Sequence, residues 1–505
     1  MKSIFISAIL GLAAAIAGAA SAQTPATTPP PRPPSPAEVA FTSNCSGCHG
    51  TDLAGGRGPS LFADSLLSAR SDADLLRTIQ KGRPDGGMPA FEGQLKDDEI
   101  SQIIAFLRVR GGELKSPRSF APDPNGKIIK SEKQTFKVEV VAAGLETPWG
   151  AVFLPDGRML VTERTGHIRV IAKGKLLPEP VKNTPVAWVR QDGGYFDIAL
   201  HPDFKKNGWI YLSFSEVAPG NATPPPPPLA PVGARSAPGT LQANIPSMTR
   251  LVRGRINAKN EWVDQQDIYR APADLYTTSV IHYGSRFLFD REGHLFWSVG
   301  DRGNHDNAQN LGSPLGKIHR VNDDGSAPKD NPFVNTPGAI ASIWSYGHRN
   351  PEGLTFDPVT GLMWESEHGP TGGDEINVVE KGHNYGWGVI SMGLEPGITK
   401  QHQAGMEDPI RFYVPSIGPS GMTFYGGARY PGWKNNLFLS ALRGEALMRY
   451  EVKGREITHQ EAVLTGFGRT RDVLVGPDGY LYVLLQNAQV LANSPGMVLR
   501  LVPAK

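Results

Sequence analysis

The spacing of hydrophobic residues changes along the chain and separates a helical part from a strand-rich part. Within residues 97–110, apolar residues recur at intervals of three and four, which places them on one face of a helix. Gly111 and Gly112 follow and predict the end of this helix. The apolar positions are Ile100, Ile103, Ile104 and Leu107.

An earlier helix is expected to begin at residue 36. Ser35 is a suitable N-cap, Pro36 suits the first helical position, and Glu38 completes a capping box. Together the two helices predict a small all-α domain over residues 36–112.

From residue 136 onward, helical periodicity gives way to a repeated unit of an apolar strand, a turn rich in Pro, Asp and Gly, and a second strand. One hairpin cannot bury both of its faces, and radial repetition of four-stranded sheets solves this problem. We therefore predict an all-β six-bladed β-propeller over residues 136–505. A β-sandwich is the alternative, but it needs fewer and less regular hairpins. The six copies begin at Ala151, Ile198, Phe287, Leu354, Met422 and Val473.

The start of the chain has the pattern of a secretory signal. Lys2 precedes an apolar run that ends in Ala20-Ser21-Ala22, which predicts a cleavable signal peptide over residues 1–22 and a periplasmic protein. A membrane anchor is the alternative, although the run is short and rich in Ala and Gly. After cleavage, no integral membrane segment is expected.

Three further segments are assigned from their composition. Each is rich in Pro and small or polar residues, which indicates extended chain rather than core. They are a Pro-rich spacer at 23–35, a linker at 113–135 and an exposed insertion at 219–238.

The composition agrees with many strands joined by turns. The balance of charges also bears on which classes of partner the protein could bind. The 505 residues include 58 Gly and 44 Pro, which favours turns over a helical bundle. Lys and Arg total 51 against 49 Asp and Glu, for a net charge of +2. This balance gives no electrostatic reason to expect nucleic acid or an acidic membrane as a partner.

The chain has only two cysteines, and they stand together in the sequence Cys45-Ser46-Gly47-Cys48-His49. This CxxCH pattern predicts covalent haem c attachment, with His49 as an iron ligand. A redox disulfide and half of a zinc site are the alternatives. Neither explains the histidine directly after Cys48, and no second pair of zinc ligands accompanies it.

The second iron ligand is expected to be a methionine. Met88 stands in Gly86-Gly87-Met88-Pro89 and is the only methionine between residues 2 and 158. An isolated Met more often fills a core, but this loop and the missing ligand favour iron. Residues 36–112 resemble small class I cytochromes c, in which Gly58-Pro59 would match the loop facing the proximal histidine.

In the propeller part, polar residues gather just after the repeat strands. No GxGxxG, GxxxxGK[ST], HExxH or GxSxG motif accompanies them. Such turns converge at one mouth of a propeller channel, and several arginines there imply an anionic ligand. Arg469 and Arg471 are two residues apart, so an extended strand would point both to one side.

Residues from about 140 to 503 resemble the soluble aldose sugar dehydrogenases that depend on pyrroloquinoline quinone, including soluble glucose dehydrogenase. The order and spacing of several motifs carry this resemblance over most of the propeller. They include residues 201–204, 347–351, 367–370, 373–377 and 384–387.

The resemblance implies a role for each matching residue. His282 would be the general base that removes the sugar hydroxyl proton, and Arg349 would lie beside the reactive quinone carbonyl. The other cofactor contacts would be Gln191, Asp192, Arg302, Asn350, His368, Arg443, Arg469 and Arg471.

The resemblance also implies two Ca²⁺ sites. The carbonyls of Gly369 and Pro370 would bind the Ca²⁺ that polarises the quinone, since oxygen ligands suit that hard cation. Glu375 and Tyr385 would hold a second, structural Ca²⁺.

Some positions depart from the family pattern. The family commonly has glutamine where Asp192 stands here, with Gln191 shifted by one position. Soluble glucose dehydrogenase has glutamine at the positions of Arg302 and His368, and lysine at that of Arg443. These changes bear on cofactor contacts and sugar preference rather than on the class of chemistry.

The sequence therefore predicts a periplasmic quinohaemoprotein that oxidises a small aldose, alcohol or aldehyde. The fused cytochrome would remove the electrons one at a time and pass them to an acceptor of the respiratory chain. A Ca²⁺-dependent propeller lactonase and a non-catalytic binding propeller remain the alternatives.

Overall fold

The computed structural model describes ten stretches of the chain. They are residues 36–50, 53, 61, 70–83, 87–113, 123–225, 245–370, 372–395, 397–486 and 496–504. The predicted signal peptide, the Pro-rich spacer and the Gly58-Pro59 loop lie outside them. Within these stretches, no helix has the length and apolar character needed to cross a membrane.

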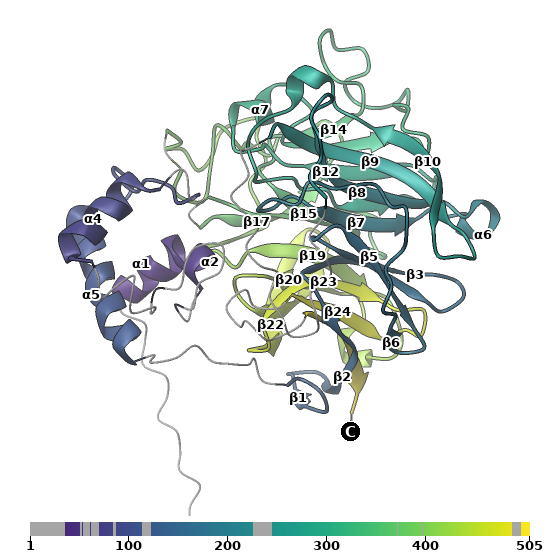
Figure 1. The fold of residues 1–505 in the computed structure, drawn as a ribbon, viewed down its shortest axis with the longest axis horizontal. Helices are drawn as coiled ribbons and strands as arrows, with labels where there is room; N and C mark the ends of the chain where they lie inside the picture. Colours follow the sequence, from purple (N-terminus) through teal and green to yellow (C-terminus); the bar gives the residue numbers. More distant parts are fainter. Residues whose placement is uncertain are drawn as a thin grey trace, which may run out of the picture. The chain divides into compact units, whose positions relative to one another are not determined.

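The N-terminal part is helical, as predicted (Figure 1). Its core joins α1, α4 and α5 through buried residues that include Phe41, Leu75 and Ile103. Among the described residues its helices are α1 (Pro36–Asn44), α2 (Ser46–His49), α4 (Asp72–Lys81) and α5 (Asp97–Glu113).

Two details of this part differ from the sequence predictions. Helix α5 continues through Gly111 and Gly112 to Glu113, so the predicted end at residue 110 is wrong by three residues. Helix α4 was not predicted, although Ser71 and Asp74 form a capping box at its start.

The rest of the chain forms six sheets, which confirms the six-bladed propeller. Every repeat found in the sequence is the first hairpin of one blade. Blade one is β3 (Pro148–Phe153), β4 (Met159–Glu163), β5 (His167–Ala172) and β6 (Lys175–Leu176). Blade two is β7 (Tyr195–Leu200), β8 (Ile210–Val217), β9 (Ser247–Ile256) and β10 (Trp262–Tyr269). Blade three is β11 (Phe287–Phe289), β12 (Leu295–Val299), β13 (Lys317–Val321) and β14 (Ile343–Tyr346).

The remaining blades follow the same antiparallel order. Blade four is β15 (Pro351–Phe356), β16 (Met363–Glu367), β17 (Asp374–Val379) and β18 (Arg411–Tyr413). Blade five is β19 (Pro419–Tyr425), β20 (Asn436–Ala441), β21 (Ala446–Lys453) and β22 (Glu456–Thr465). Blade six is β23 (Arg469–Val475), β24 (Leu481–Gln486) and β25 (Gly496–Pro503), completed by β2 (Thr135–Leu145) and β1 (Ile128–Lys130). Short helices α6 (Phe204–Asn207), α7 (Asp306–Gln309), η2 (Ala273–Leu275) and η3 (Pro431–Trp433) lie between strands.

Blade six closes the ring by joining the two ends of the propeller. Strand β2 pairs antiparallel with β25, and its register places Phe136 opposite Pro503. Figure 1 shows β2 close to the C-terminus. Strand β1 falls inside the segment predicted as a linker and pairs with β2, so the end of that segment belongs to the blade.

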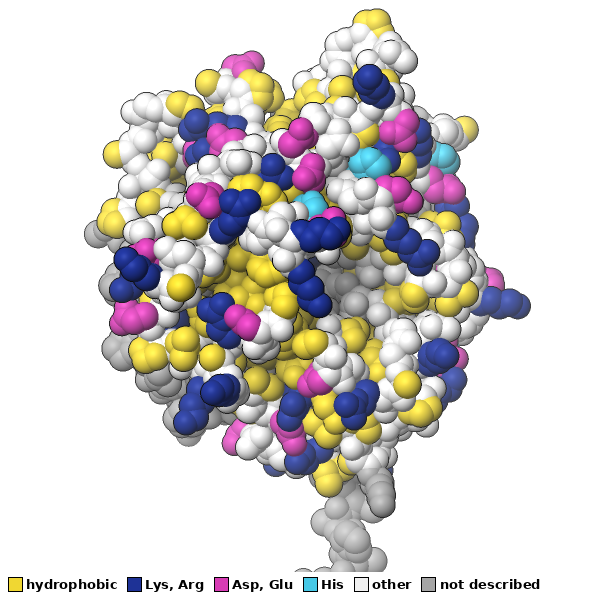
Figure 2. Space-filling model, turned by 90° about the vertical axis from the view of Figure 1, so that its right-hand side faces the viewer, with side chains coloured by type: hydrophobic (Ala, Val, Ile, Leu, Met, Phe, Trp, Pro, Cys, Tyr) yellow, Lys and Arg dark blue, Asp and Glu magenta, His cyan; other side chains and the backbone are white. Residues whose placement is uncertain are grey.

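Charges of both signs are mixed on one face of the molecule. On the face drawn in Figure 2, basic and acidic side chains are interspersed among hydrophobic ones. This mixture agrees with the small net charge of +2.

Candidate functional site

The loops next to the first strands of blades three and four bring four predicted site residues together. The Asp301 amide donates to the Arg349 carbonyl at 2.8 Å, and the His368 amide donates to the Asn350 carbonyl at 3.3 Å. The Asn350 Oδ1 accepts from the Gly284 amide at 3.0 Å, two residues after His282. These backbone contacts fix residues from separate blades in one place.

His282 forms a buried pair with Asp301. Their side chains are 12% and 2% exposed, and His282 Nδ1 lies 2.6 Å from Asp301 Oδ1. Trp387 Nε1 donates to the other carboxylate oxygen at 2.6 Å. Because an ionised carboxylate only accepts hydrogen bonds, Nδ1 carries the proton and Nε2 is left to accept one.

The charges around this pair suit a general base. Burial alone raises the pKa of Asp301, but His282, Arg349 and the Gly303 amide outweigh it and lower that pKa to about 2. Burial and then the charge of Arg349 lower the pKa of His282, against the opposing effect of Asp301. His282 is therefore neutral at pH 7 and able to take a proton.

The backbone at this pair leaves little freedom. His282 has a φ of +55°, a conformation that L residues rarely adopt. A Cβ at Gly300 would lie 2.3 Å from the His282 carbonyl oxygen. Only glycine at position 300 permits this close approach, which sets the place of the histidine.

Asp301 is expected to position the base. Asp301→Asn removes the carboxylate that fixes the His282 tautomer, so kcat should fall roughly tenfold or more. It also removes an effect that raises the pKa of His282, so the acid limb of the pH–kcat/KM profile should move to lower pH. Asp306→Asn, at an exposed position nearby, is the matched control. An unmoved acid limb in Asp301→Asn would contradict the assignment.

Arg349 is held by the loop that contains the predicted metal carbonyls. Its Nη1 donates to the His368 carbonyl at 3.0 Å, and its amide donates to Glu367 Oε2. The guanidinium lies 5.2 Å from the centre of the Trp387 ring, the same ring that bonds Asp301. Arg349 and His282 therefore share their supporting residues.

Several buried charges surround this centre. The charge of Asp192 acts on His282, Arg302, Glu352 and Arg471, which places it among them. Burial raises the pKa of Glu352, but Arg471 and His368 outweigh that effect and lower it. Glu352 was not predicted from the sequence, because only the fold brings it next to Arg471 and His368.

Guanidinium nitrogens in this region are buried without a hydrogen-bond partner among the described residues. Burial lowers the pKa of Arg302, Arg443 and Arg471 despite nearby acidic groups. Unpaired buried donors are costly, so their presence fits a bound anionic group with several oxygen acceptors. They are Arg302 Nε and Nη1, Arg349 Nε and Arg471 Nε.

The surroundings of the other predicted cofactor contacts differ from one residue to the next. Arg302 stacks on the Tyr283 ring at 3.5 Å and donates to the Ser279 carbonyl. Strand β23 changes register between Thr470 and Asp472, so the two-residue period that was expected to align Arg469 with Arg471 does not hold there. Gln191 adopts a φ of +51° at the head of the turn that carries Asp192.

The loop after β16, which carries two of the predicted calcium ligands, is tightly folded. A Cβ at Gly369 would lie 2.2 Å from the Gly373 carbonyl, so the loop needs glycine to fold back on itself. Asp374 Oδ1 accepts from the Gly369 amide at 2.9 Å, and Oδ2 accepts from the Gly418 amide at 2.7 Å. Asp374 thereby fixes the segment that carries the Gly369 and Pro370 carbonyls.

A cluster of buried acidic residues lies next to the backbone of Arg349. Ligand atoms of His348, Glu365 and Glu367 all lie within 4.8 Å of one another and are buried. Burial, followed by repulsion from Glu367, raises the pKa of Glu365 and Glu375 well above the usual value. Buried carboxylates that repel each other fit a bound cation. Of these residues, the sequence analysis had named only Glu375 as a metal ligand.

Tyr385 contacts this cluster through its ring. The ring stacks on His348 with centres 4.7 Å apart. Its hydroxyl donates to the Val378 carbonyl at 2.7 Å and accepts from the Glu380 amide at 2.9 Å. These two bonds fix the orientation of the Tyr385 side chain beside the cluster.

The CxxCH segment folds as a short helical turn. The His49 amide donates to the Cys45 carbonyl at 2.9 Å, which sets the histidine one turn from the first cysteine. Burial raises the pKa of the Cys45 thiol to about 12. Cys45 and Met88 pack against the same hydrophobic core. The fold thereby brings the predicted attachment point and second iron ligand into one small domain.

Met88→Ala is expected to leave the haem attached and to remove the sulfur–iron bond. Met88 is held in place by backbone bonds to Arg83 in both directions, at 2.8 and 3.1 Å, so truncation of its side chain should spare the loop. The thioether-to-iron charge-transfer band of the oxidised protein should disappear. Its retention would show that another group is the ligand.

The fold and site define a six-bladed propeller with a buried His–Asp pair and a basic centre, joined to a cytochrome c domain. Residues 145–492 match the family model described as Glucose / Sorbosone dehydrogenase, and the chain belongs to this family. Residues 33–107 match the model described as Cytochrome C oxidase, cbb3-type, subunit III. The family is one of oxidoreductases.

Known relatives match the propeller over most of their own length. The chain is 37% identical over 371 residues to the Aldose sugar dehydrogenase YliI of Escherichia coli, covering 72% of this chain and 93% of that protein. The crystal structure of the apo form of the E. coli soluble aldose sugar dehydrogenase matches with a TM-score of 0.64 and 34% identity, over 73% of this chain and 100% of the other. The PQQ-bound aldose sugar dehydrogenase of Streptomyces coelicolor matches with a TM-score of 0.56 and 27% identity, over 75% and 99%.

Proposed function

We propose that this protein is a periplasmic aldose sugar dehydrogenase that uses pyrroloquinoline quinone and passes electrons to a covalently bound haem c. The observation that carries the proposal is the set of unpaired buried guanidinium nitrogens beside the His282–Asp301 pair. These donors match the carboxylates and carbonyls of such a quinone, and the PQQ-bound relative supports the choice.

The residues divide the work of oxidation. The bound quinone would supply the two-electron acceptor for the hydride that leaves the sugar carbon. His282 Nε2 takes the hydroxyl proton, while Asp301 keeps the imidazole in the required tautomer. Arg349 supplies fixed positive charge where negative charge develops. Burial of the pair excludes water and strengthens these interactions.

Ca²⁺ is proposed at two places. The Gly369 and Pro370 carbonyls would hold one ion beside Arg349, and the cluster of Glu365, Glu367 and Glu375 would hold the other. Since Glu367 also accepts from the amides of Arg349 and Asn350, the second ion would stabilise the loop that carries the cofactor contacts.

Removal of Ca²⁺ is expected to lower the Tm of the protein by several degrees. An ion present at 100 times its Kd contributes about 2.7 kcal/mol to folding. Thermal melts with a chelator and after re-addition of Ca²⁺ measure the shift. Glu365→Gln should reduce the Ca²⁺-dependent shift, whereas Glu179→Gln, at an exposed bend outside the acidic clusters, should not. Equal shifts in both variants would contradict the proposed second site.

One assay tests the proposed function. The purified chain should oxidise aldoses with an artificial acceptor only after quinone and Ca²⁺ have been added. Activity without the quinone, or none with it, would overturn the proposal. A Ca²⁺-dependent lactonase would instead hydrolyse lactones without an acceptor, and it gives no reason for the arginines or the CxxCH segment. A binding propeller would show neither activity.

The signal-peptide pattern supports a periplasmic location and the oxidising conditions that suit a c-type cytochrome. Export of a fusion between residues 1–35 and a reporter enzyme that is active only in the periplasm tests this location. The partners are then a small sugar and an electron acceptor of the respiratory chain.

A further inference from the structure

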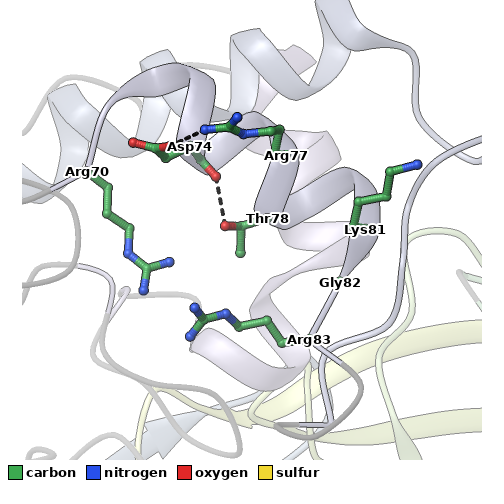
Figure 3. A pocket seen from close by; sticks show the side chains of 7 residues that line it. All are labelled: Arg70, Asp74, Arg77, Thr78, Lys81, Gly82 and Arg83. Atoms are coloured by element: carbon green, nitrogen blue, oxygen red, sulfur yellow. Dashed lines mark hydrogen bonds and ion pairs between the residues drawn. The ribbon is translucent and has the colours of Figure 1, made fainter.

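Helix α4 of the cytochrome domain carries an open pocket of about 440 Å³ with a basic lining. Figure 3 shows the guanidinium groups of Arg70 and Arg83 pointing toward one another across it. Two like charges that converge in this way favour an anion between them. The lining residues are Arg70, Asp74, Arg77, Thr78, Lys81, Gly82 and Arg83.

The pocket lies on the outer side of the helix rather than toward the haem-binding core. Asp74, Thr78 and Lys81 recur at helical spacing on one side of α4. Leu75 and Ile79, on the adjacent face of the helix, are buried in the core of the domain. The pocket is therefore open to a partner from outside the domain.

The pocket is basic although the cytochrome domain as a whole is slightly acidic. Residues 36–112 contain eight Lys and Arg and ten Asp and Glu, yet the pocket lining has four basic side chains and one carboxylate. Arg77 and Lys81 are 71% and 68% exposed, although they contact Asp74 and Glu92. Surface ion pairs of this kind are weak, so both cations remain available to a partner.

The pocket is connected to the predicted iron ligand. Arg83 lines the pocket, and its amide and carbonyl both pair with the backbone of Met88 at 2.8 and 3.1 Å. A partner bound at the pocket would therefore sit beside the loop that carries this ligand. Short distance to the haem is what electron transfer to a docked protein requires.

We propose that this basic pocket is the docking site for an acidic electron-accepting protein. The inference rests on the proposed function, which supplies electrons to the haem. At the docked surface, one electron leaves ferrous haem and reduces the oxidised metal centre of the partner, with no bond or proton exchanged. Carboxylates of the partner enter between Arg70 and Arg83, and Arg77 and Lys81 steer the approach.

The test uses the full-length protein with its haem reduced chemically, so it does not depend on sugar oxidation. Stopped-flow mixing measures the second-order rate of haem reoxidation by plastocyanin, an acidic blue-copper protein, at several ionic strengths. The variant Arg70→Gln/Arg77→Gln/Lys81→Gln is compared with Lys173→Gln/Lys175→Gln/Lys205→Gln. The control removes the same charge from exposed propeller positions.

The pocket variant should react about tenfold more slowly at low ionic strength and lose most of its salt dependence, while the control keeps the wild-type values. Its haem spectrum and midpoint potential should be unchanged. Equal slowing in both variants would overturn the proposal, since net charge alone would then explain the rate. A shifted potential would also overturn it, because the arginines would then act on the haem.

A second acceptor separates docking from attraction of small anions. Ferricyanide is an anion too small to need a docking surface. Slower reaction of the pocket variant with ferricyanide but not with plastocyanin would overturn the proposal. Slower reaction with plastocyanin and a nearly unchanged rate with ferricyanide would support it, whereas equal slowing with both acceptors would also overturn it. A protein that failed to oxidise sugar would leave these measurements valid.

Discussion

Replacement of His282 by Gln should lower kcat by about 10²-fold or more, the usual effect of losing a positioned base. Quinone and Ca²⁺ binding should persist, because the proposed contacts to both come from the arginines and the Gly369 loop rather than from His282. The loss should fall on kcat rather than KM, since proton removal develops in the transition state. Steady-state kinetics of the quinone-loaded variant measure it.

The pH dependence of the wild type provides a second check on the base. A lowered pKa keeps His282 neutral down to a pH below its ordinary value of 6.5. Activity should therefore be retained at pH 7. It should decline only at a pH below the ordinary histidine pKa of 6.5, as the imidazole gains its second proton. The acid limb should be absent from the residual activity of His282→Gln.

A matched histidine shows whether the effect is specific. His201 lies in the turn between β7 and β8, where its Nδ1 accepts from the Asp203 amide at 2.9 Å, so His201→Gln should keep wild-type kcat. Near-wild-type kcat in His282→Gln would exclude His282 as the base. His368 would then be the better candidate than His348, which is fully buried and bonded to Ser345.

The sequence predicted those parts of the fold that depend on local signals. Each of the six repeats joins two alternating strands through a turn, so hairpins such as β3–β4 and β23–β24 could be read directly. The outer strands carry weaker patterns. Strand β6 has two residues, and β10 is largely exposed in its middle. Pairing of β2 with β25 joins residues more than 350 positions apart, which no local pattern reports.

The residues of the candidate site could also be predicted only where a local motif contains them. His282, Arg349 and Asn350 stand in motifs that the sequence displays, and the fold does bring them together. Asp301 and Glu352 have no motif of their own. Their importance comes from neighbours on other strands, namely His282, Trp387 and Arg471. The position of Asp301 directly before Arg302 in a polar turn was the one available signal.

The buried cluster of glutamates was also hard to predict from the sequence. Glu365 and Glu367 alternate along β16, so their sequence spacing resembles that of any strand. Only the packing of β16 against β17, with Glu367 opposite Glu375, shows that three carboxylates share one buried space. Burial of like charges is a tertiary property, so it supports the proposed cation site through residues that the sequence alone could not bring together.

The combined change Cys45→Ser/Cys48→Ser should abolish covalent haem and, with it, electron delivery to a protein acceptor. Both thioethers are lost, so only the predicted iron ligands His49 and Met88 would remain to hold the porphyrin, and neither bonds it covalently. Denaturing gels stained for haem should be negative, and sugar-dependent reduction of plastocyanin should fall to background. Cys45→Ser alone, which keeps one thioether, is the internal control and should retain part of the haem.

Sugar oxidation with a small-molecule acceptor should survive this double substitution. The hydrophobic core of the cytochrome domain consists of residues between 40 and 107, whereas the blade cores contain only residues from 129 onward. Because the two sets share no member, loss of haem should leave the propeller folded and its Tm nearly unchanged. A propeller that melts early or loses activity with the small acceptor would show instead that its stability depends on the haem domain. Full activity with plastocyanin in the haem-free protein would show that electrons leave the propeller directly.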